Sequence, residues 1–344
     1  MPTVALAALQ TCLETALGRF GVSVDHAHQI AEVLLDAELR GYPDHGVYFF
    51  GELAGWYRSG ALNPRPEIRV VRESDAALLL DGDAGCGVVP ANLAMQWCTR
   101  TARERGLAWA GIQRSGHFVA AAPYATAAAR AGCIALVAAN VTPLMPPPGG
   151  RTRTLGTNPL CFAAPTGGAA PLVFDMASSG IAGFKARLAA REGQMLEPGL
   201  IADASGRPSV DPRDFVAGGL LLPVGGHKGF GLALMVEVLA GVLTGANFGP
   251  DAGVTHGKEG HFFLVLDPEQ FMSGAEFRSR MDDLVAHVKA SEHVQGVEDI
   301  FVPGERGQRR MSELRRAGAV PIDAQGWHTL EQVCASVDVP LPVP

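Results

Sequence analysis

The glycine-rich residues 225–231 and the apolar run that follows them constrain the fold more than any other stretch of this chain. Four glycines surround His227, Lys228 and Phe230. From residue 230 to residue 243 apolar side chains occupy nearly every position, and Glu237 is the only charged one. Because a helix that is apolar on every face is typical of a protein interior, we predict that residues 230–243 form the central, fully buried helix of the core.

The start of this predicted helix is a candidate anion site. Its glycines keep side chains away from the N–H groups that a first helical turn leaves unpaired, and Lys228 adds a positive charge. A helix start of this kind binds a phosphate or a carboxylate. The alternative is a glycine-rich turn whose lysine reaches solvent, since short glycine and lysine motifs also occur by chance.

Charge and cysteine usage limit the class of partner. The formal net charge is -7 and lysines and arginines form no cluster, so we expect a small-molecule partner, no nucleic acid and no membrane surface. The six cysteines show neither metal-ligand nor disulfide spacing, and we predict no bound metal. The first residues lack the basic region of a secretory signal and no apolar run reaches the ~18 residues of a membrane span, so we expect a cytoplasmic protein.

A candidate proton donor stands where the second predicted helix ends. Gly41 and Pro43 terminate the helix predicted over residues 25–39 and hold Asp44 and His45 on a tight turn. A histidine titrates near neutral pH, and a neighbouring carboxylate can set its tautomer, so His45 is suited to general acid catalysis. Considered alone, His45 is equally well explained as a surface histidine.

The middle of the chain, residues 88–175, alternates between helix and strand as α/β domains do. A strand predicted over residues 107–112 and a helix predicted over residues 120–131 flank His117. This histidine is therefore expected at the C-terminal end of a strand, where open α/β sheets bind ligands. The alternative is that His117 only caps the helix.

An ordinary dinucleotide-binding fingerprint is absent from the sequence. Gly85 and Gly87 are followed by Pro90 where that fingerprint requires a third glycine. Asp175 follows an apolar strand and is a candidate for catalytic support or cofactor contact, although an aspartate that caps the next turn is an equally simple explanation. Residues 180–222 have the composition of a loop-rich excursion.

Four landmarks, considered together, resemble the type 2 malate/L-lactate dehydrogenase family. They are Arg40-Gly41 with Asp44-His45-Gly46-Val47, Ser115-Gly116-His117-Phe118, Pro147-Pro148-Gly149-Gly150 with Leu155-Gly156-Thr157-Asn158-Pro159, and Phe174-Asp175-Met176-Ala177 with Gly226-His227-Lys228-Gly229. The resemblance extends in consistent order over residues 5–335. The family includes sulfolactate, ureidoglycolate and diketogulonate oxidoreductases and reductases of cyclic imino acids such as Δ1-piperideine-2-carboxylate.

The resemblance implies a fold and an assembly. The fold is a sulfolactate dehydrogenase-like, non-Rossmann α/β fold, with a mixed sheet, helices on both faces and a helical domain built from both termini. We expect an N-terminal helical part at residues 1–60, connecting strands and a helix at 61–105, a cofactor-binding α/β domain at 106–270, and C-terminal helices at 271–344. The resemblance also implies a homodimer that binds NAD or NADP.

The resemblance further implies roles for individual residues. His45 is the implied proton donor, His117 is the second catalytic candidate, and Asp44 and Asp175 support them. The expected cofactor contacts are His117, Phe118, Val141, Thr157, Asp175, Met176, Ala177, His227, Lys228, Gly229, Gly304, Glu305 and Arg306. The expected substrate contacts are Arg40, Phe49 and Thr157.

Two positions depart from the family pattern. Asp44 replaces the usual Ser or Thr before the catalytic histidine, and its carboxylate is expected to raise the pKa of His45. Phe49 stands where many members carry an arginine suited to a second anionic group. We therefore expect a substrate with one carboxylate and an apolar or cyclic body.

The leading hypothesis is an NAD(P)H-dependent reductase of a small 2-oxo acid or cyclic 2-imino acid, with the proton delivered by His45. One alternative is a malate/L-lactate-type dehydrogenase that works oxidatively on a 2-hydroxy acid. A second alternative, kept open by Asp44 and Phe49, is an inactive family member that acts as a binding protein. Turnover of a small panel of oxo and imino acids separates the three.

Overall fold

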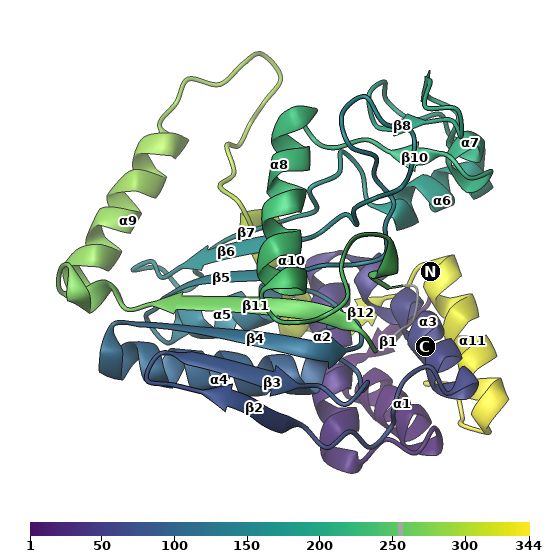
Figure 1. Ribbon diagram of the computed structural model, residues 1–344, viewed down its shortest axis with the longest axis horizontal. Coiled ribbons are helices and arrows are strands. Elements are labelled where there is room, and N and C mark those ends of the chain that lie inside the picture. The colour runs from purple at the N-terminus through teal and green to yellow at the C-terminus, as the bar shows by residue number, and fades with distance from the viewer. Residues whose placement is uncertain (254–256) are drawn as a thin grey trace.

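The fold is built around a seven-stranded mixed sheet (Figure 1). A computed structural model describes residues 1–253 and 257–344. In sheet order, the strands are β2 (Arg69–Glu73), β3 (Ala77–Asp81), β4 (Leu107–Ser115), β11 (Glu259–Leu266), β5 (Ile134–Ala139), β6 (Leu160–Ala164) and β7 (Leu172–Met176). The glycine-rich stretch predicted just before β11 starts at His256, which lies outside the described residues.

The centre of the sheet combines near and distant parts of the chain. Strands β3 and β4 are parallel and are joined by α4 (Val88–Arg105). The predicted alternation of helix and strand over residues 88–175 is present, but β4 and β5 are not neighbours in the sheet. Strand β11 is inserted between β4 and β5 and is antiparallel to both. The C-terminal ends of β4 and β5 therefore lie beside the start of β11, at the same end of these central strands.

Helices cover both faces of the sheet, as predicted. One face carries α4 and α5 (Ala122–Arg130), and small side chains such as Ala110 and Val137 form a closed core there. The other face carries α8 (His227–Val236), which continues as the π-helical segment η2 (Glu237–Val242) and packs on Ala138 and Phe262. Figure 1 shows α8 crossing in front of the sheet.

Helices from both ends of the chain form a layer beside the sheet, as predicted. They are α1 (Leu6–Arg19), α2 (Val24–Arg40), α3 (Val47–Ser59), α10 (Glu305–Ala317) and α11 (Ala324–Val337). The short strand β1 (Thr3–Ala5) pairs with β12 (Ala319–Pro321), so hydrogen bonds join the two ends of the chain. The sulfur atoms of Cys12 and Cys334 lie 3.4 Å apart between α1 and α11. The boundaries predicted at residues 60, 105 and 270 stay a prediction.

The prediction of a central helix buried on all sides is wrong for the single chain. The inner side of α8 and η2 packs on the sheet, but Leu234, Val238 and Leu243 are 47%, 49% and 65% exposed. An apolar pattern shows that a face avoids water, and it does not show whether the same chain provides the cover. In this chain one side of the helix is left uncovered.

The stretch of residues 180–222, predicted to be loop-rich, contains more regular structure than expected. This region contains α6 (Gly183–Glu192), α7 (Pro212–Val216) and a small sheet of β8 (Ile201–Ala202), β9 (Pro208–Ser209) and β10 (Leu220–Leu221). Ile201, Phe215 and Leu221 form a separate hydrophobic cluster there. Strands of two residues are too short to show an alternating pattern, which is why the sequence did not predict them.

One long helix stands apart from the rest of the fold. Helix α9 (Gly274–Lys289) has no buried residue and projects at the side of the molecule (Figure 1). Two 3-10 turns, η3 (Gly249–Asp251) and η4 (Pro268–Gln270), flank β11 in the sequence. Within residues 1–253 and 257–344, every helix is too short or too polar for a membrane crossing.

Candidate active site

A cavity of about 340 Å³ opens at the sheet edge where β4 and β5 end and β11 begins. Its volume is in the range of small-molecule sites. The predicted site residues on its wall are Asp44, His45, His117, Phe118, Val141, Thr157, Asp175, Met176 and Ala177. The fold thus brings residues of all four sequence landmarks to one place, although the Gly226–Gly229 part of the fourth landmark is not among the described wall residues. In the described part of the chain, no group of His, Cys, Asp and Glu side chains is arranged to hold a metal ion.

His45 is held by the turn that ends α2. Gly41 has a φ of 88°, a left-handed conformation that glycine adopts without strain. It redirects the chain into the 3-10 turn η1 (Pro43–His45). The turn is fixed on its far side by Glu38, whose carboxylate accepts a 2.9 Å hydrogen bond from the Val47 N–H at the start of α3.

Asp44 and His45 form an ion pair on the cavity wall. Asp44 Oδ2 lies 3.4 Å from His45 Nδ1, and the Asp44 side chain is only 6% exposed. Burial acts to lower the pKa of His45, but the hydrogen bond and charge of Asp44, helped by the charge of Asp175, raise the pKa above its ordinary value. Burial acts to raise the pKa of Asp44, and His45 outweighs it, so the pKa of Asp44 is lowered. The expected influence of Asp44 on His45 is confirmed.

His117 lies just after the C-terminal end of β4, where the strand and helix pattern placed it. The Val119 N–H donates a hydrogen bond of 3.0 Å to His117 Nδ1, so the neutral ring carries its proton on Nε2. The ring centres of His117 and His45 are 6.2 Å apart. Both imidazoles therefore border the same small volume.

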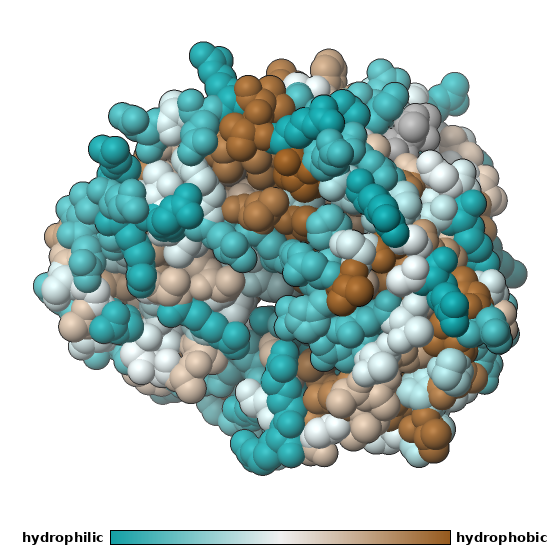
Figure 2. Space-filling view, turned by 90° about the horizontal axis from the view of Figure 1, so that it is seen from below, coloured by the Kyte–Doolittle hydropathy of each residue, from teal (hydrophilic) through white to brown (hydrophobic). Residues whose placement is uncertain are grey.

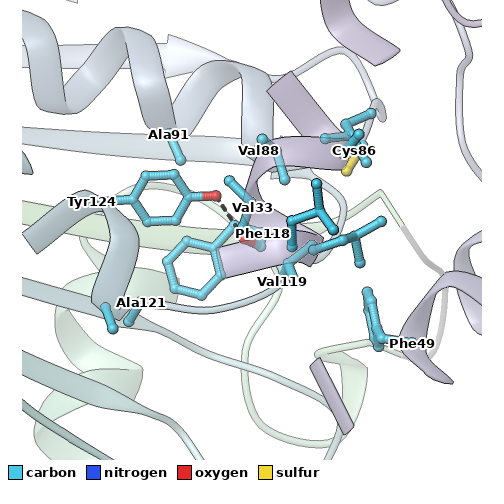
Figure 3. Close-up of a cluster of buried hydrophobic side chains, with 14 of the residues drawn as sticks. Val33, Phe49, Cys86, Val88, Ala91, Phe118, Val119, Ala121 and Tyr124 are labelled. Carbon is cyan, nitrogen blue, oxygen red and sulfur yellow. Dashed lines mark hydrogen bonds between the residues drawn. The ribbon is translucent and has the colours of Figure 1, made fainter. Parts of the chain in front are cut away.

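Phe118 fixes the backbone next to His117. Its ring stacks on His261 with the ring centres 4.6 Å apart. Its carbonyl accepts a 2.6 Å hydrogen bond from the Tyr124 hydroxyl, inside a tightly packed apolar cluster (Figure 3). A side chain held by such packing loses little freedom when a ligand binds.

Aromatic rings form the wall behind the histidines. The Phe49 ring centre lies 4.7 Å from that of His117 and 5.5 Å from that of Trp56, and Phe49 is 9% exposed. Trp56 borders the cavity directly. The wall is therefore apolar around position 49, where an arginine could bind a second anionic group of a ligand.

Asp175 ends β7 and connects the cavity to α5. Its Oδ2 accepts a hydrogen bond of 3.0 Å from the Ala122 N–H in the first turn of that helix. Burial raises the pKa of Asp175, although the charge of His45 and the bond from Ala122 oppose the rise. The next two residues, Met176 and Ala177, continue along the cavity wall.

The predicted anion site lies outside this cavity in the single chain. Gly225, Gly226, His227 and Lys228 are all exposed, and neither His227 nor Lys228 is among the described residues of the cavity wall. The start of α8 is nevertheless anchored beside the strand that carries Asp175. The Val224 N–H donates to the Ser178 carbonyl over 2.9 Å, and a Cβ at Gly229 would lie 2.7 Å from that carbonyl.

Two of the remaining predicted contacts lie in a neighbouring hollow that shares Tyr42 and Asp175 with the cavity. Arg40 and Gly304 line this hollow. Arg40 Nε lies 2.5 Å from Asp36 Oδ1, so its charge is already paired. At the start of α10, Glu305 pairs with Lys289, and the Arg306 guanidinium lies 4.3 Å from the centre of the Phe301 ring.

Among the cavity-wall residues that sequence reasoning missed, Tyr42, Trp56, Lys185 and Glu259 carry large aromatic or ionisable side chains. Lys185 lies on α6, in the region predicted to be loop-rich, so no pattern marked it. Glu259 did leave a signal, because it is an acidic residue immediately before an apolar strand. It is 2% exposed, and burial raises its pKa to about 8.

Comparisons with known proteins agree with this geometry. A family model described as malate/L-lactate dehydrogenase matches residues 4–331. Ureidoglycolate dehydrogenase (NAD(+)) of Escherichia coli O157:H7 is 34% identical over 322 residues, 92% of this chain and 91% of that protein. Delta(1)-pyrroline-2-carboxylate/Delta(1)-piperideine-2-carboxylate reductase of Pseudomonas putida is 33% identical over 323 residues, 92% of this chain and 93% of that protein. The solved sulfolactate dehydrogenase of Methanocaldococcus jannaschii superimposes with a TM-score of 0.90 at 31% identity, over 99% of this chain and 98% of that one.

Proposed function

The chain belongs to the malate/L-lactate dehydrogenase family and is an oxidoreductase, and from this premise we propose that it reduces a small 2-oxo acid or a cyclic 2-imino acid with NAD(P)H. The observation that carries the proposal is the pair of histidines on one cavity wall, 6.2 Å apart, with Asp44 against one of them. Such an arrangement serves proton transfer at a reacting centre.

His45 is the proton donor in this proposal. Reduction of a carbonyl or imine without a proton would leave an alkoxide or amide anion in a largely apolar cavity, which is costly. A positioned acid contributes roughly two to four orders of magnitude in rate. Asp44 keeps His45 in the charged, donating form at higher pH than an isolated imidazole would allow. His117, held as the Nε2–H tautomer when neutral, is the second group able to orient or protonate the substrate.

The chain's residues fit a nicotinamide dinucleotide. When bound, the reduced nicotinamide supplies the hydride. The reactive end of the cofactor would be held by the residues that line the cavity beside His45, which are His117, Phe118, Val141, Thr157, Asp175, Met176 and Ala177. Gly225 and Gly226 have φ values of 59° and 63°, and a Cβ at Gly226 would meet nothing within 4 Å, so the space in front of α8 can admit a phosphate. The Lys228 and Gly229 N–H groups already donate to the Gly225 and Val224 carbonyls, so the charge of Lys228 is the main attraction for the phosphate in this proposal. His227, Lys228 and Gly229 would bind that phosphate, and Gly304, Glu305 and Arg306 would contact the far end of the cofactor.

The substrate class follows from the charges of the cavity. Lys185 on α6 is the one cation besides the two histidines among the described residues of the wall, and we assign it to the substrate carboxylate. Trp56 borders the cavity and Phe49 packs against Trp56 and His117, so aromatic rings stand where a second carboxylate would need a cation. We therefore propose a substrate with one carboxylate and an apolar or cyclic body. In this proposal Thr157 contacts the substrate from the cavity wall, and Arg40 lies in the adjoining hollow.

A panel of substrates tests this function. The purified protein should quench or shift reduced nicotinamide fluorescence, and it should oxidise NADH or NADPH in the presence of pyruvate-like acids or Δ1-piperideine-2-carboxylate. A preference for oxaloacetate over both substrate types would contradict the single-carboxylate proposal. Binding of the nicotinamide without turnover of any substrate would identify a binding protein instead.

We also propose a homodimer, on the basis of the uncovered apolar surface. Leu234, Val238 and Leu243 on α8 and η2 are about half exposed or more, and Trp109 and Phe174 on the same face of the sheet are 44% and 42% exposed. Figure 2 shows apolar side chains gathered at the top of the view, the side that faces the viewer in Figure 1. A second copy of this chain is the proposed cover.

Light scattering of the purified protein tests the dimer. The expected mass is that of two chains of 36.0 kDa. The double variant Val238→Lys, Leu243→Lys should shift the mass to one chain, because it places charges on the proposed interface. Val216→Lys, on the exposed surface of α7, is the matched control and should remain a dimer. A single-chain mass for the wild-type protein at micromolar concentration would contradict the proposal.

A further inference from the structure

Glu259 is the most unusual side chain of the cavity wall. It begins β11, between the ends of β4 and β5, and it is 2% exposed. Its Oε2 is buried and has no hydrogen-bond partner among residues 1–253 and 257–344. A buried carboxyl oxygen without a partner costs free energy, on the order of 1–3 kcal/mol. Such a group is retained where a ligand provides the partner.

In the described part of the chain, no neighbouring side chain offers Glu259 a compensating charge. The nearest ring on its own strand, His261, is fully buried, and burial lowers the pKa of that imidazole to about 4, so it is neutral. Cys86, from the turn before α4, is a thiol whose pKa is raised to about 12 by burial. The other titratable groups on the wall are Asp44, His45, His117, Asp175 and Lys185, with Tyr42. Two of these are carboxyls, and Lys185 and His45 already influence Asp44.

We propose that Glu259 is a second proton donor in the cavity, which makes the site suited to a cyclic 2-imino acid in preference to a 2-oxo acid. This inference rests on the proposed function, since it names the substrate class of the same cavity. The raised pKa of Glu259, about 8 from burial, agrees with a carboxyl that holds its proton near neutral pH.

A count of protons gives the reason. Reduction of a neutral cyclic imine to a secondary ammonium takes up one hydride at carbon and two protons at nitrogen. His45 protonates the nitrogen lone pair, hydride addition to carbon moves the C=N π pair onto nitrogen, and Glu259 protonates that new pair. The products are a neutral imidazole, a carboxylate beside the ammonium, and two new N–H bonds; both side chains regain their protons from water. A 2-oxo acid takes up one hydride and one proton, so it needs one donor only.

The same step explains why an unpaired carboxyl is tolerated in the free protein. As a neutral acid, Glu259 avoids the cost of a buried charge. After its proton has moved, the carboxylate lies against a cation, and the pair is stabilised by the low polarity around it. A 2-oxo acid and its hydroxy acid product carry no cation, so they leave Glu259 without this partner.

Substitution of Glu259 tests the inference. Glu259→Gln keeps the shape and removes the acid, so kcat for Δ1-piperideine-2-carboxylate should fall about 100-fold while kcat for pyruvate changes little. Glu259→Asp keeps an acid with a shorter reach and should lose less. Affinity for NAD(P)H should be unchanged in both variants. Equal losses on both substrates, or weaker cofactor binding in Glu259→Gln, would overturn the proposal.

Calorimetry on the wild-type protein gives a second test that needs neither turnover nor a variant. The cyclic secondary amino acid formed from Δ1-piperideine-2-carboxylate carries an ammonium. When it binds at pH 7 to the protein loaded with oxidised cofactor, Glu259 should release about one proton. The release is measured by comparing the heat of binding in buffers with different ionisation enthalpies. L-Lactate should release none. Identical proton release for the two ligands would overturn the inference.

The two proposals fail in different ways. If the wild-type protein reduces neither oxo nor imino acids, the proposed function is wrong. If it reduces pyruvate-like acids and leaves Δ1-piperideine-2-carboxylate unchanged, the role of Glu259 is wrong and the proposed function stands.

Discussion

The two ends of the proposed site are built in opposite ways. At the cavity, His117 and Asp175 each accept a hydrogen bond from a backbone N–H of the same chain, and His45 is paired with the buried Asp44. At the start of α8, Gly225, Gly226, His227 and Lys228 lie in solvent. The end proposed for chemistry is therefore preorganised by one chain, and the end proposed for phosphate binding is open.

This difference bears on how much one chain can do alone. Proton transfer depends on sub-ångström placement, and the fold provides it by burial and hydrogen bonds. Phosphate binding depends on charge and open N–H groups, which tolerate exposure. The resemblance implies that His45 and Lys228 act on the same substrate and cofactor complex. In the single chain Lys228 lies outside the cavity that holds His45, and a shared cavity in a dimer stays a prediction. The following experiments test whether the two ends differ as described.

The largest effect is expected at the closed end. His45→Ala removes the proposed proton donor, so kcat should fall by roughly two to four orders of magnitude while affinity for NAD(P)H is largely retained. Steady-state kinetics and a fluorescence titration measure the two quantities. His28→Ala, an exposed histidine of α2 paired with Glu14, is the control and should match the wild-type protein. Loss of cofactor affinity in His45→Ala would remove the distinction between the two ends.

The next largest effect is expected at the open end. Lys228→Ala should weaken NAD(P)H binding by about 1.5–3 kcal/mol if the lysine donates a charged hydrogen bond to the cofactor. kcat at saturating cofactor should change little, and Lys228→Arg, which keeps the charge, should lose less. Equal cofactor affinity in Lys228→Ala and the wild-type protein would show that the open end has no part in binding.

The smallest change is expected from the partner of His45. Asp44→Asn removes the carboxylate that raises the pKa of His45, so that pKa should move down. The protonated imidazole is the donor, and reductive kcat/KM therefore decreases as pH rises through the pKa of His45. In Asp44→Asn this decrease should occur at lower pH than in the wild-type protein. An unchanged pH profile would mean that another group limits the reaction.

Local patterns predicted the parts of the fold that depend on neighbouring residues. The helix that ends at Gly41, the strand before His117 and the alternation of helix and strand after residue 88 all carry short-range signals, and the structure has them. The resemblance added the cavity residues that no spacing could group. Asp44, read as a departure from the family pattern, correctly predicted the raised pKa of His45.

The missed features depend on contacts between distant segments. Glu259 reaches the cavity only because β11 is inserted between β4 and β5, and nothing near residue 259 encodes that insertion. Lys185 belongs to a small region whose strands are two residues long. The exposed side of α8 was predicted to be buried, because an apolar pattern is the same whether its cover comes from this chain or from another.

The position of β11 also has a consequence for biosynthesis. The seven-stranded sheet cannot close until residue 266 has left the ribosome, and until then β4 and β5 each lack the neighbour that β11 provides. Open edges of this kind are templates for aggregation, and closure across more than 100 residues of sequence is slow. The last strand of this sheet to be made therefore joins the two halves of the sheet and, through its first residue, completes the wall of the cavity.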